Sequence, residues 1–202
     1  MPNTARKRDP VLTRKRILKA AKALLARSDG NLEMAWVSRK AGVSQGLAYH
    51  YFGSKEGLLK AVVEDFYDRA ESSVLMARMD DRGDWAGRER RRVRSYVDFL
   101  LDDPMGAAVI TRLAATPAVA AVEARRWDSL ITEGSKNIAE GQKRGVVTAT
   151  QPSELLAAMT LGAMRAAVVS AFTSPEPVDA EKVSQDLWEF VRCGLGIKET
   201  AS

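Results

Sequence analysis

Residues 41–44 read Ala-Gly-Val-Ser and separate two short segments whose apolar residues have helical spacing. A glycine allows a tight turn between two helices, and a serine that follows it can cap the second helix. Two helices joined in this way form a helix-turn-helix, in which the N-terminus of the second helix can enter the major groove of DNA. This turn is therefore the first candidate for a functional site.

Other kinds of chemistry find little support in the sequence. His50 is the single histidine and Cys193 the single cysteine, which excludes an internal disulfide and argues against a zinc site. No Gly-rich phosphate loop follows a strand pattern, and there is no Glu-x-x-His pair. We therefore expect no catalytic site, no metal and no cofactor, and we do not expect an enzyme.

The charge of the chain is unevenly distributed. Residues 1–60 contain 13 Lys or Arg against 4 Asp or Glu, whereas residues 61–202 contain 18 against 22. A strongly basic first part favours binding of a polyanion such as nucleic acid, because local cation density governs counterion release. A well-solvated basic face would have the same composition, so charge alone leaves both interpretations open.

Apolar residues recur at helical spacing along almost the whole chain, and no long segment alternates with period two. The fold class that we predict is all-α, with about nine helices. Capping residues, prolines and glycines place these helices at about 12–27, 33–41, 45–51, 54 to beyond 71, 84–101, 103 onward, 117–144, 152–172 and 179–195.

The cytoplasm is the expected location, without membrane association. Residues 1–10 contain three basic residues and no apolar stretch follows them, which argues against a secretory signal. Residues 155–175 are apolar, but Arg165 in their middle is costly at a bilayer centre. We read this segment as a buried helix of a soluble protein.

The stretch from Val37 to Leu58 reads VSRKAGVSQGLAYHYFGSKEGL, and it follows a basic helix and precedes an all-α body. It resembles the TetR family of bacterial transcription regulators, whose usual pattern is much like AGVSxGxxYxxFxSKExL. The resemblance covers about residues 12–60. Beyond them it rests on the number of helices, the Glu-Gly-Gln-Lys-Arg-Gly run at 140–145 and the small-residue helix at 152–172.

The resemblance implies a homodimer in which residues 1–56 form a helix-turn-helix DNA-binding domain and residues 57–202 a ligand-binding and dimerisation domain. The implied partners are double-stranded DNA with a palindromic operator and a small molecule. The implied function is a sequence-specific transcription regulator, a repressor that the ligand releases from its operator. The alternative is an all-α small-molecule binding protein whose helix-turn-helix is purely structural. A steep salt dependence of binding to one palindromic fragment would distinguish the two.

Positions in the family motif suggest a role for each residue of the DNA interface. Gln45 could contact adenine through two hydrogen bonds, and Tyr49, one turn later, could reach a thymine methyl or a phosphate. Ser44, His50 and Lys55 are expected to contact phosphate, Lys55 together with the amides that begin the fourth helix. The expected DNA-binding residues are Arg39, Ser44, Gln45, Gly46, Leu47, Tyr49, His50 and Lys55.

A structural role stays open for several of these residues. His50 could be a solvated residue at a helix end, and Lys55 could merely balance Glu56. The aromatic pair Tyr51 and Phe52 is expected to pack inside the module.

The chain also departs from the family pattern at residues 32–35 and 47–48. Some phosphate contacts must therefore be missing or moved. Arg14, Arg39 or the basic residues at 6–8 could replace them, the last as an arm in the minor groove.

Methionine and aromatic residues at inward-facing positions suit an adaptable apolar pocket, although they also fill any helical core. Arg165 stands apart as the only charge between Glu154 and Glu176, and a buried guanidinium demands a partner. That partner could be a carboxylate such as Glu189 or Glu133, or an acidic group on the ligand. The candidate ligand-binding residues are Arg165, Trp127, Phe99, Met159 and Phe66.

The last two helices, at 152–172 and 179–195, carry small and apolar residues on more than one face. A two-fold four-helix interface between two copies of the chain would cover these residues and match a palindromic operator. Trp188 and Cys193 are expected to be buried in this packing. The sequence indicates neither the ligand, the operator, the regulated genes nor the sign of regulation.

Overall fold

The computed structural model describes residues 9–28, 31–76, 84–114 and 116–198. These residues form helices and no strand, so the all-α prediction is confirmed. The helices are α1 (Pro10–Leu25), α2 (Met34–Ala41), α3 (Gln45–Phe52), α4 (Lys55–Met76), α5 (Trp85–Asp102), the π-helix η1 (Ala108–Leu113), α6 (Pro117–Lys143), α7 (Ser153–Thr173) and α8 (Ala180–Gly194).

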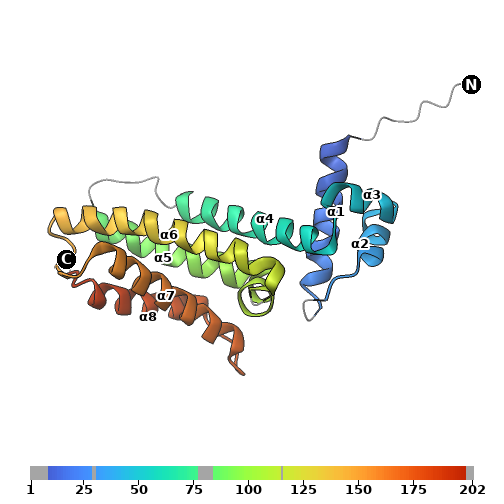
Figure 1. The fold of residues 1–202 in the computed structure, drawn as a ribbon. Helices are drawn as coiled ribbons and strands as arrows, with labels where there is room; N and C mark the ends of the chain where they lie inside the picture. The colour runs from blue at the N-terminus through green and yellow to red at the C-terminus, as the bar shows by residue number, and fades with distance from the viewer. Residues whose placement is uncertain (1–8, 29–30, 77–83, 115, 199–202) are drawn as a thin grey trace, which may run out of the picture.

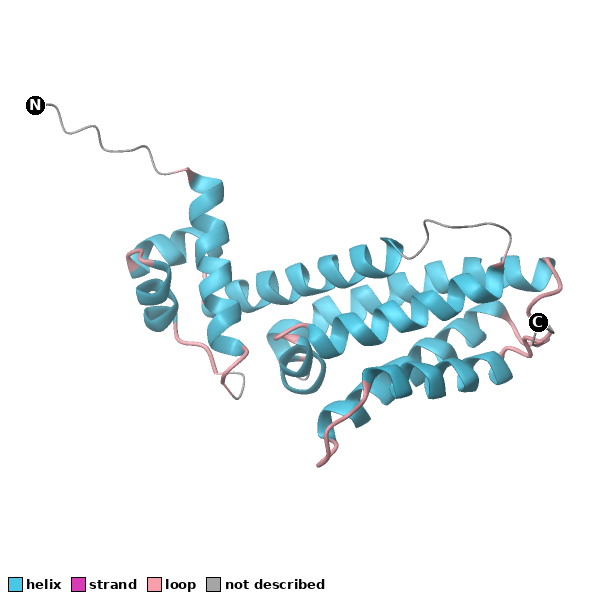
Figure 2. Ribbon diagram, turned by 180° about the vertical axis from the view of Figure 1, so that it is seen from behind, coloured by secondary structure: helices cyan, strands magenta, loops and turns pink. Residues whose placement is uncertain are grey.

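The first three helices lie at one end of the molecule, and α4 runs from them along the helices of the C-terminal part (Figure 1). The view from behind also shows α4 running from the N-terminal helices to the C-terminal ones (Figure 2). Its packing partners include α1 and α3 at one end and α5 and α6 along its length. Whatever moves α4 can therefore act on both parts of the chain.

Polar side chains fix where several helices begin, as the sequence patterns indicate. The Asp9 carboxylate accepts the backbone N–H of Val11 at 2.8 Å, so α1 begins at Pro10 rather than near Leu12. Asp84 caps α5 and Asp179 caps α8 in the same way. These three helix starts are encoded locally, which explains why the sequence predicts them within about two residues.

The segment after Asp103-Pro104 differs from the expected ordinary helix. It forms a turn, in which the Asp103 carboxylate accepts the backbone N–H of Met105 at 2.8 Å, and then the wider η1 helix. The Ala114 N–H donates to the Val109 carbonyl at 3.1 Å, five residues back. Four of the six η1 residues are buried, which is more than a simple amphipathic stripe provides.

Two clusters of buried apolar residues hold the described part together. The first joins α1 and α2 to α4, η1 and the start of α6, with Ile17, Val37, Val62 and Val119 as members. The second joins α5, the end of α6, α7 and α8. The first cluster extends from α1 and α2 into η1 and α6, so it crosses the domain boundary expected at residue 56. That boundary stays a prediction.

The apolar helix α7 is long enough to cross a membrane by length and composition, and it is the one described helix of which this is true. It packs instead against α6, α8, α5 and η1. The expectation of a buried helix holds for one side only, because Leu155, Met159 and Ala166 are exposed on the other.

Candidate nucleic-acid interface and ligand cavity

The turn between α2 and α3 has the geometry that its sequence predicts. Gly42 ends α2 with a φ of 64°, in the left-handed region. The Ser44 hydroxyl caps α3 and accepts the backbone N–H of Leu47 at 3.2 Å. From α1, the Arg16 guanidinium donates to the carbonyls of Ala41 at 2.5 Å and Gly42 at 3.3 Å. The turn is thus held by its own residues and by α1.

Two glycine substitutions next to each other in space should have opposite effects on stability. Gly42→Ala should lower the free energy of unfolding by about 1–2 kcal/mol, because alanine is disfavoured at a positive φ. Gly46→Ala should raise it by up to about 1 kcal/mol, because Gly46 lies inside α3 with open space around it. Urea unfolding of both variants measures the difference, and equal effects would show that Gly42 does not define the turn.

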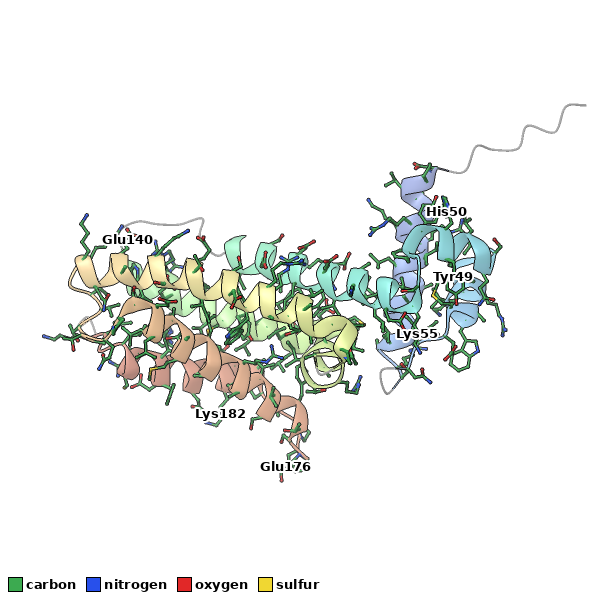
Figure 3. The ribbon with its side chains drawn as sticks, in the orientation of Figure 1. Tyr49, His50, Lys55, Glu140, Glu176 and Lys182 are labelled. Carbon is green, nitrogen blue, oxygen red and sulfur yellow. The ribbon has the colours of Figure 1, made fainter. Side chains whose placement is uncertain are left out.

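The recognition helix candidate α3 has one exposed face. Gln45, Gly46, Tyr49 and His50 are exposed on it, with the Tyr49 side chain 42% exposed (Figure 3). Leu47 is half-buried, and Ala48 packs in the first apolar cluster. The two expected base-reading residues, Gln45 and Tyr49, are one turn apart and thus share a surface that is exposed in the described structure.

The aromatic pair behaves as expected, because Tyr51 and Phe52 pack on the first apolar cluster. The Arg14 guanidinium lies 5.2 Å from the centre of the Phe52 ring, and the Arg39 side chain is exposed on α2. Both arginines are therefore available near the candidate interface. The basic residues expected to form an arm at 6–8 lie outside the described residues.

Lys55 lies at the start of α4, where an anion can bind (Figure 3). Its ammonium group is 3.4 Å from the side-chain oxygen of Asn31 and 3.8 Å from the Glu33 carboxylate, and its charge also contributes to lowering the pKa of Glu56. Glu56 uses the same helix end, where its backbone N–H and the Ser54 hydroxyl lower the pKa of its carboxyl group. A phosphate at this position would have to compete with the Glu56 carboxylate.

Sequence reasoning missed one exposed aromatic residue near this interface. Trp36, in the first turn of α2, is 52% exposed. Trp36 lies outside the buried stripe of Met34, Val37 and Ala41, and the sequence pattern already indicates this. A large aromatic side chain on the solvent side of a short amphipathic helix is a candidate for a contact with a partner.

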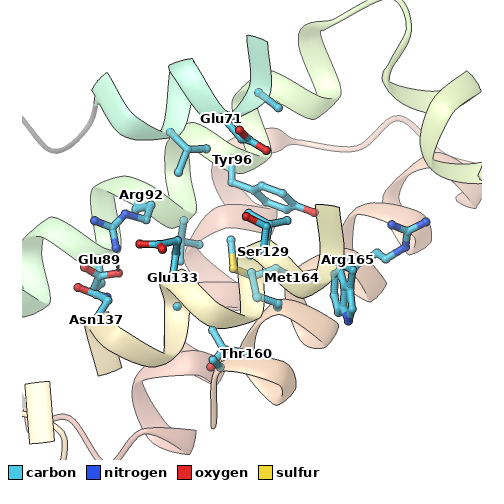
Figure 4. Close-up of a pocket in the computed structure, with 18 of the residues that line it drawn as sticks. Glu71, Glu89, Arg92, Tyr96, Ser129, Glu133, Asn137, Thr160, Met164 and Arg165 are labelled. Carbon is cyan, nitrogen blue, oxygen red and sulfur yellow. Dashed lines mark hydrogen bonds and ion pairs between the residues drawn. The ribbon is translucent and has the colours of Figure 1, made fainter. Parts of the chain in front are cut away.

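A cavity of about 290 Å³ lies among α4, α5, α6 and α7, and most of its wall is apolar. Ile110 of η1 and Val191 of α8 also contribute to the wall. Glu89, Arg92 and Asn137 gather on one side of this space, and Tyr96 and Arg165 lie on the other (Figure 4). A space of this size and lining suits a small organic molecule.

The cavity includes two of the five residues proposed as ligand contacts, Trp127 and Arg165. Phe66 and Phe99 lie elsewhere, with their rings 5.4 Å apart in the first apolar cluster. The expectation that Met159 faces inward is wrong, because its side chain is 61% exposed. A small-residue helix presents apolar residues on several faces, so periodicity alone could not identify the inner one.

Arg165 has a carboxylate partner, but not one of the two that the sequence suggested. Its guanidinium lies 3.1 Å from the Glu123 carboxylate, rather than near Glu189 or Glu133. The Tyr67 hydroxyl donates to the same carboxylate. Although burial lowers the pKa of Arg165, Tyr67 and Glu123 raise it by more, and burial together with Glu123 raises the pKa of Tyr67 far above its usual value. Arg165 is therefore cationic and Tyr67 protonated at neutral pH.

Trp85, at the start of α5, is another polar group in the cavity wall. It is fully buried, and its indole N–H has no hydrogen-bond partner among the described residues. An unpartnered buried donor costs about 1–3 kcal/mol. The start of α5 therefore contains an unsatisfied buried donor.

A chain of ion pairs connects α1 to α4 and to the end of α5. Asp65 of α4 lies 2.8 Å from the Lys22 ammonium of α1 and 3.0 Å from the Arg69 guanidinium. Arg69 also pairs with Asp103, at the end of α5. Tyr67, between Asp65 and Arg69, lines the cavity. The same two turns of α4 thus contact α1 and the ligand space.

The outer surface of α7 and α8 carries an apolar patch, which we define as Leu155, Met159, Ala166 and Phe190. Met159 is 61% and Phe190 65% exposed. Within the single chain Trp188 is buried and the Cys193 side chain is exposed, so burial of Cys193 in a two-fold interface stays a prediction. Large apolar side chains exposed in this way are candidates for an interaction surface.

Comparison with known proteins adds to this geometry. Residues 17–62 match the family model of bacterial regulatory proteins, tetR family. The HTH-type transcriptional regulator BetI of Stenotrophomonas maltophilia (strain R551-3) is 36% identical over 70 residues, which is 35% of this chain and 34% of the relative. This match thus spans about a third of the length of the curated relative.

Solved structures share the fold over almost the whole chain. A protein of Syntrophomonas wolfei str. Goettingen assigned to the TetR family is 20% identical, with a TM-score of 0.77, over 96% of this chain and 100% of that one. NalD, the secondary repressor of the MexAB-OprM multidrug efflux pump in Pseudomonas aeruginosa, is 18% identical, with a TM-score of 0.73 and the same coverage.

Proposed function

We propose that the chain is a sequence-specific DNA-binding transcription regulator of the bacterial cytoplasm, because residues 17–62 match the family model of bacterial regulatory proteins, tetR family. The observation that carries this proposal is the exposed face of α3, with Gln45 and Tyr49 one turn apart behind a well-formed turn. Such a face fits the major groove, where an amide can pair with adenine.

Selection from a library of random DNA duplexes tests the proposal. The full chain should enrich a palindrome whose half-sites are centred about 34–36 Å apart, or a multiple of this spacing. Enrichment of no sequence over the starting library would contradict sequence-specific binding and would favour a small-molecule binding protein with a structural helix-turn-helix.

Gln45 and Lys55 should contribute to DNA binding in different ways. Gln45→Ala should weaken the binding free energy for the selected site by about 1–3 kcal/mol, because a base contact is lost. It should also relax the sequence preference at one base position. Lys55→Ala should lower the affinity for all DNA sequences alike, because a phosphate contact is lost. The slope of log K against log salt should become shallower by about 1. Fluorescence anisotropy on the selected and scrambled duplexes measures both effects, and an equal, uniform loss would remove Gln45 from base reading.

The ligand cavity supports regulation through α4. This helix begins beside α3 and carries Tyr67 into the cavity wall, so a ligand there can favour a position of α4 that moves the recognition helices away from the operator spacing. The chain would then be a repressor that its ligand releases from DNA. Linkage requires the effect to be reciprocal, so operator DNA lowers the ligand affinity by the same factor.

The apolar patch on α7 and α8 supports a homodimer. A two-fold axis through this surface would pack α7 and α8 of one copy against those of the other and cover Met159 and Phe190. Two copies would also present two recognition helices to the two halves of a palindrome.

A further inference from the structure

The ionic groups in the cavity wall already have partners of opposite charge, within the wall or beside it. Arg165 is paired with Glu123, and on the opposite side Arg92 lies 2.5 Å from Glu89. Glu133 has a partner at 2.7 Å in Lys136. A charged ligand would have to separate such a pair or enter an apolar space without a counterion, and both cost desolvation energy. The wall therefore favours a neutral molecule.

Tyr96 offers an unused hydrogen-bond donor on the Arg165 side of the cavity. Its hydroxyl points toward the side where Arg165 lies, and it has no hydrogen-bond partner among the described residues (Figure 4). Burial raises the pKa of Tyr96 to about 12, with a lowering contribution from Arg165 and a raising one from Glu123. The hydroxyl therefore keeps its proton at neutral pH.

Glu123 supplies the matching acceptor. One of its carboxylate oxygens accepts from the Tyr67 hydroxyl and the other from the Arg165 guanidinium. A carboxylate has about four acceptor sites, so sites remain for a ligand. This side of the cavity thus presents a free donor and a partly used acceptor, at the end of a space that is otherwise mainly apolar.

We propose that the cavity binds a neutral, mainly apolar molecule with a hydroxyl group, which accepts a hydrogen bond from Tyr96 and donates one to Glu123. A hydroxyl matches because it is both donor and acceptor. A carboxylate would be repelled by Glu123, and an ammonium group by Arg165. The inference rests on the proposed function, because it takes the cavity as the ligand site, and it deepens that function by naming the chemical class of the ligand.

Calorimetric titration of the full chain with two series of matched probes tests this inference. The first series is 1-adamantanol, adamantane-1-carboxylate and 1-adamantylammonium, and the second is 4-phenylphenol, biphenyl-4-carboxylate and biphenyl-4-ylmethylammonium. In at least one series the hydroxyl compound should bind about tenfold or more tighter than both charged compounds. Absence of binding by either hydroxyl compound, or equal or tighter binding of a charged one in both series, overturns the inference.

Variants of the two hydrogen-bonding groups locate the binding. Tyr96→Phe should lower the affinity for the hydroxyl probe about fivefold, because one hydrogen bond is lost. It should leave the melting temperature unchanged, because the Tyr96 hydroxyl has no partner within the described part of the protein. Glu123→Gln leaves Arg165 without its counterion and should reverse the preference toward the carboxylate probe. Tyr51→Phe removes a hydroxyl outside the cavity and is the matched control. Unchanged binding by Tyr96→Phe overturns the inference.

Failure of this inference is distinguishable from failure of the proposed function. The probe titrations contain no DNA, and the selection experiment contains no probe. A chain that selects a palindrome but prefers charged probes contradicts the ligand class alone. A chain that binds hydroxyl probes but selects no DNA contradicts the regulator alone.

Discussion

Replacement of Met159 and Phe190 by glutamate should convert a dimer into monomers and lower the operator affinity by about 100-fold or more. Both side chains are exposed in the single chain, at 61% and 65%, so the substitutions should not disturb its core. Four carboxylates at a two-fold interface would repel one another without counterions. Loss of the dimer removes the second recognition helix, and bivalent binding contributes a factor of about 100 to 10,000.

Ala139→Glu is the matched control for the dimer variants, because it adds a carboxylate to an exposed position of a different helix, α6. Light scattering coupled to size-exclusion chromatography gives the mass, and anisotropy gives the operator affinity. A Met159→Glu, Phe190→Glu variant that keeps the mass and affinity of the parent would contradict the proposed interface.

The second large effect concerns the ion pair in the cavity wall. Arg165→Met should lower the melting temperature by about 4–8 °C, which corresponds to about 2 kcal/mol for a chain of this size. The substitution leaves the Glu123 carboxylate, only 14% exposed, without its cation. The cost is smaller than for a fully buried pair because Arg165 is 30% exposed and water screens the interaction.

The double variant Arg165→Met, Glu123→Gln should recover most of the lost stability, because it leaves no unpaired charge and Tyr67 can still donate to the glutamine oxygen. Calorimetric melting of the single and double variants measures the coupling between the two residues. If Arg165→Met has the melting temperature of the parent protein and loses only the response to a ligand, Arg165 binds the ligand and does not stabilise the fold.

The parts of the fold that the sequence predicts well are those with local causes. Asp9, Asp84 and Asp179 cap their helices through bonds to backbone groups two or three residues away. The turn at Gly42 is equally local. By contrast, the partner of Arg165 lies 42 residues away, and several glutamates could have reached it. Only the packing of α6 on α7 selects Glu123.

The candidate sites follow the same division. The residues of the helix-turn-helix could be placed because one short motif contains them all. The cavity could not be placed, because it is lined from at least four helices and its polar residues, such as Tyr96 and Trp85, look like core residues in sequence. The sequence pattern predicts that Met159 lines the cavity, but its side chain is exposed. An apolar residue on a helix is equally suited to a core, a cavity or an interface, so its type does not identify its location.

A salt titration with three duplexes tests whether this chain binds a palindrome as a dimer. The duplexes are the selected palindrome, one half-site with scrambled flanking sequence, and a fully scrambled duplex. Log K for the palindrome should fall linearly with log salt, with a slope of about −0.9 for each phosphate neutralised, and two chains should bind each duplex. The palindrome should bind about 1,000-fold or more tighter than the scrambled duplex at physiological salt, and the half-site should lie between them. Equal affinity for all three duplexes, or an affinity that hardly changes with salt, would show that the chain does not recognise a palindrome as a dimer.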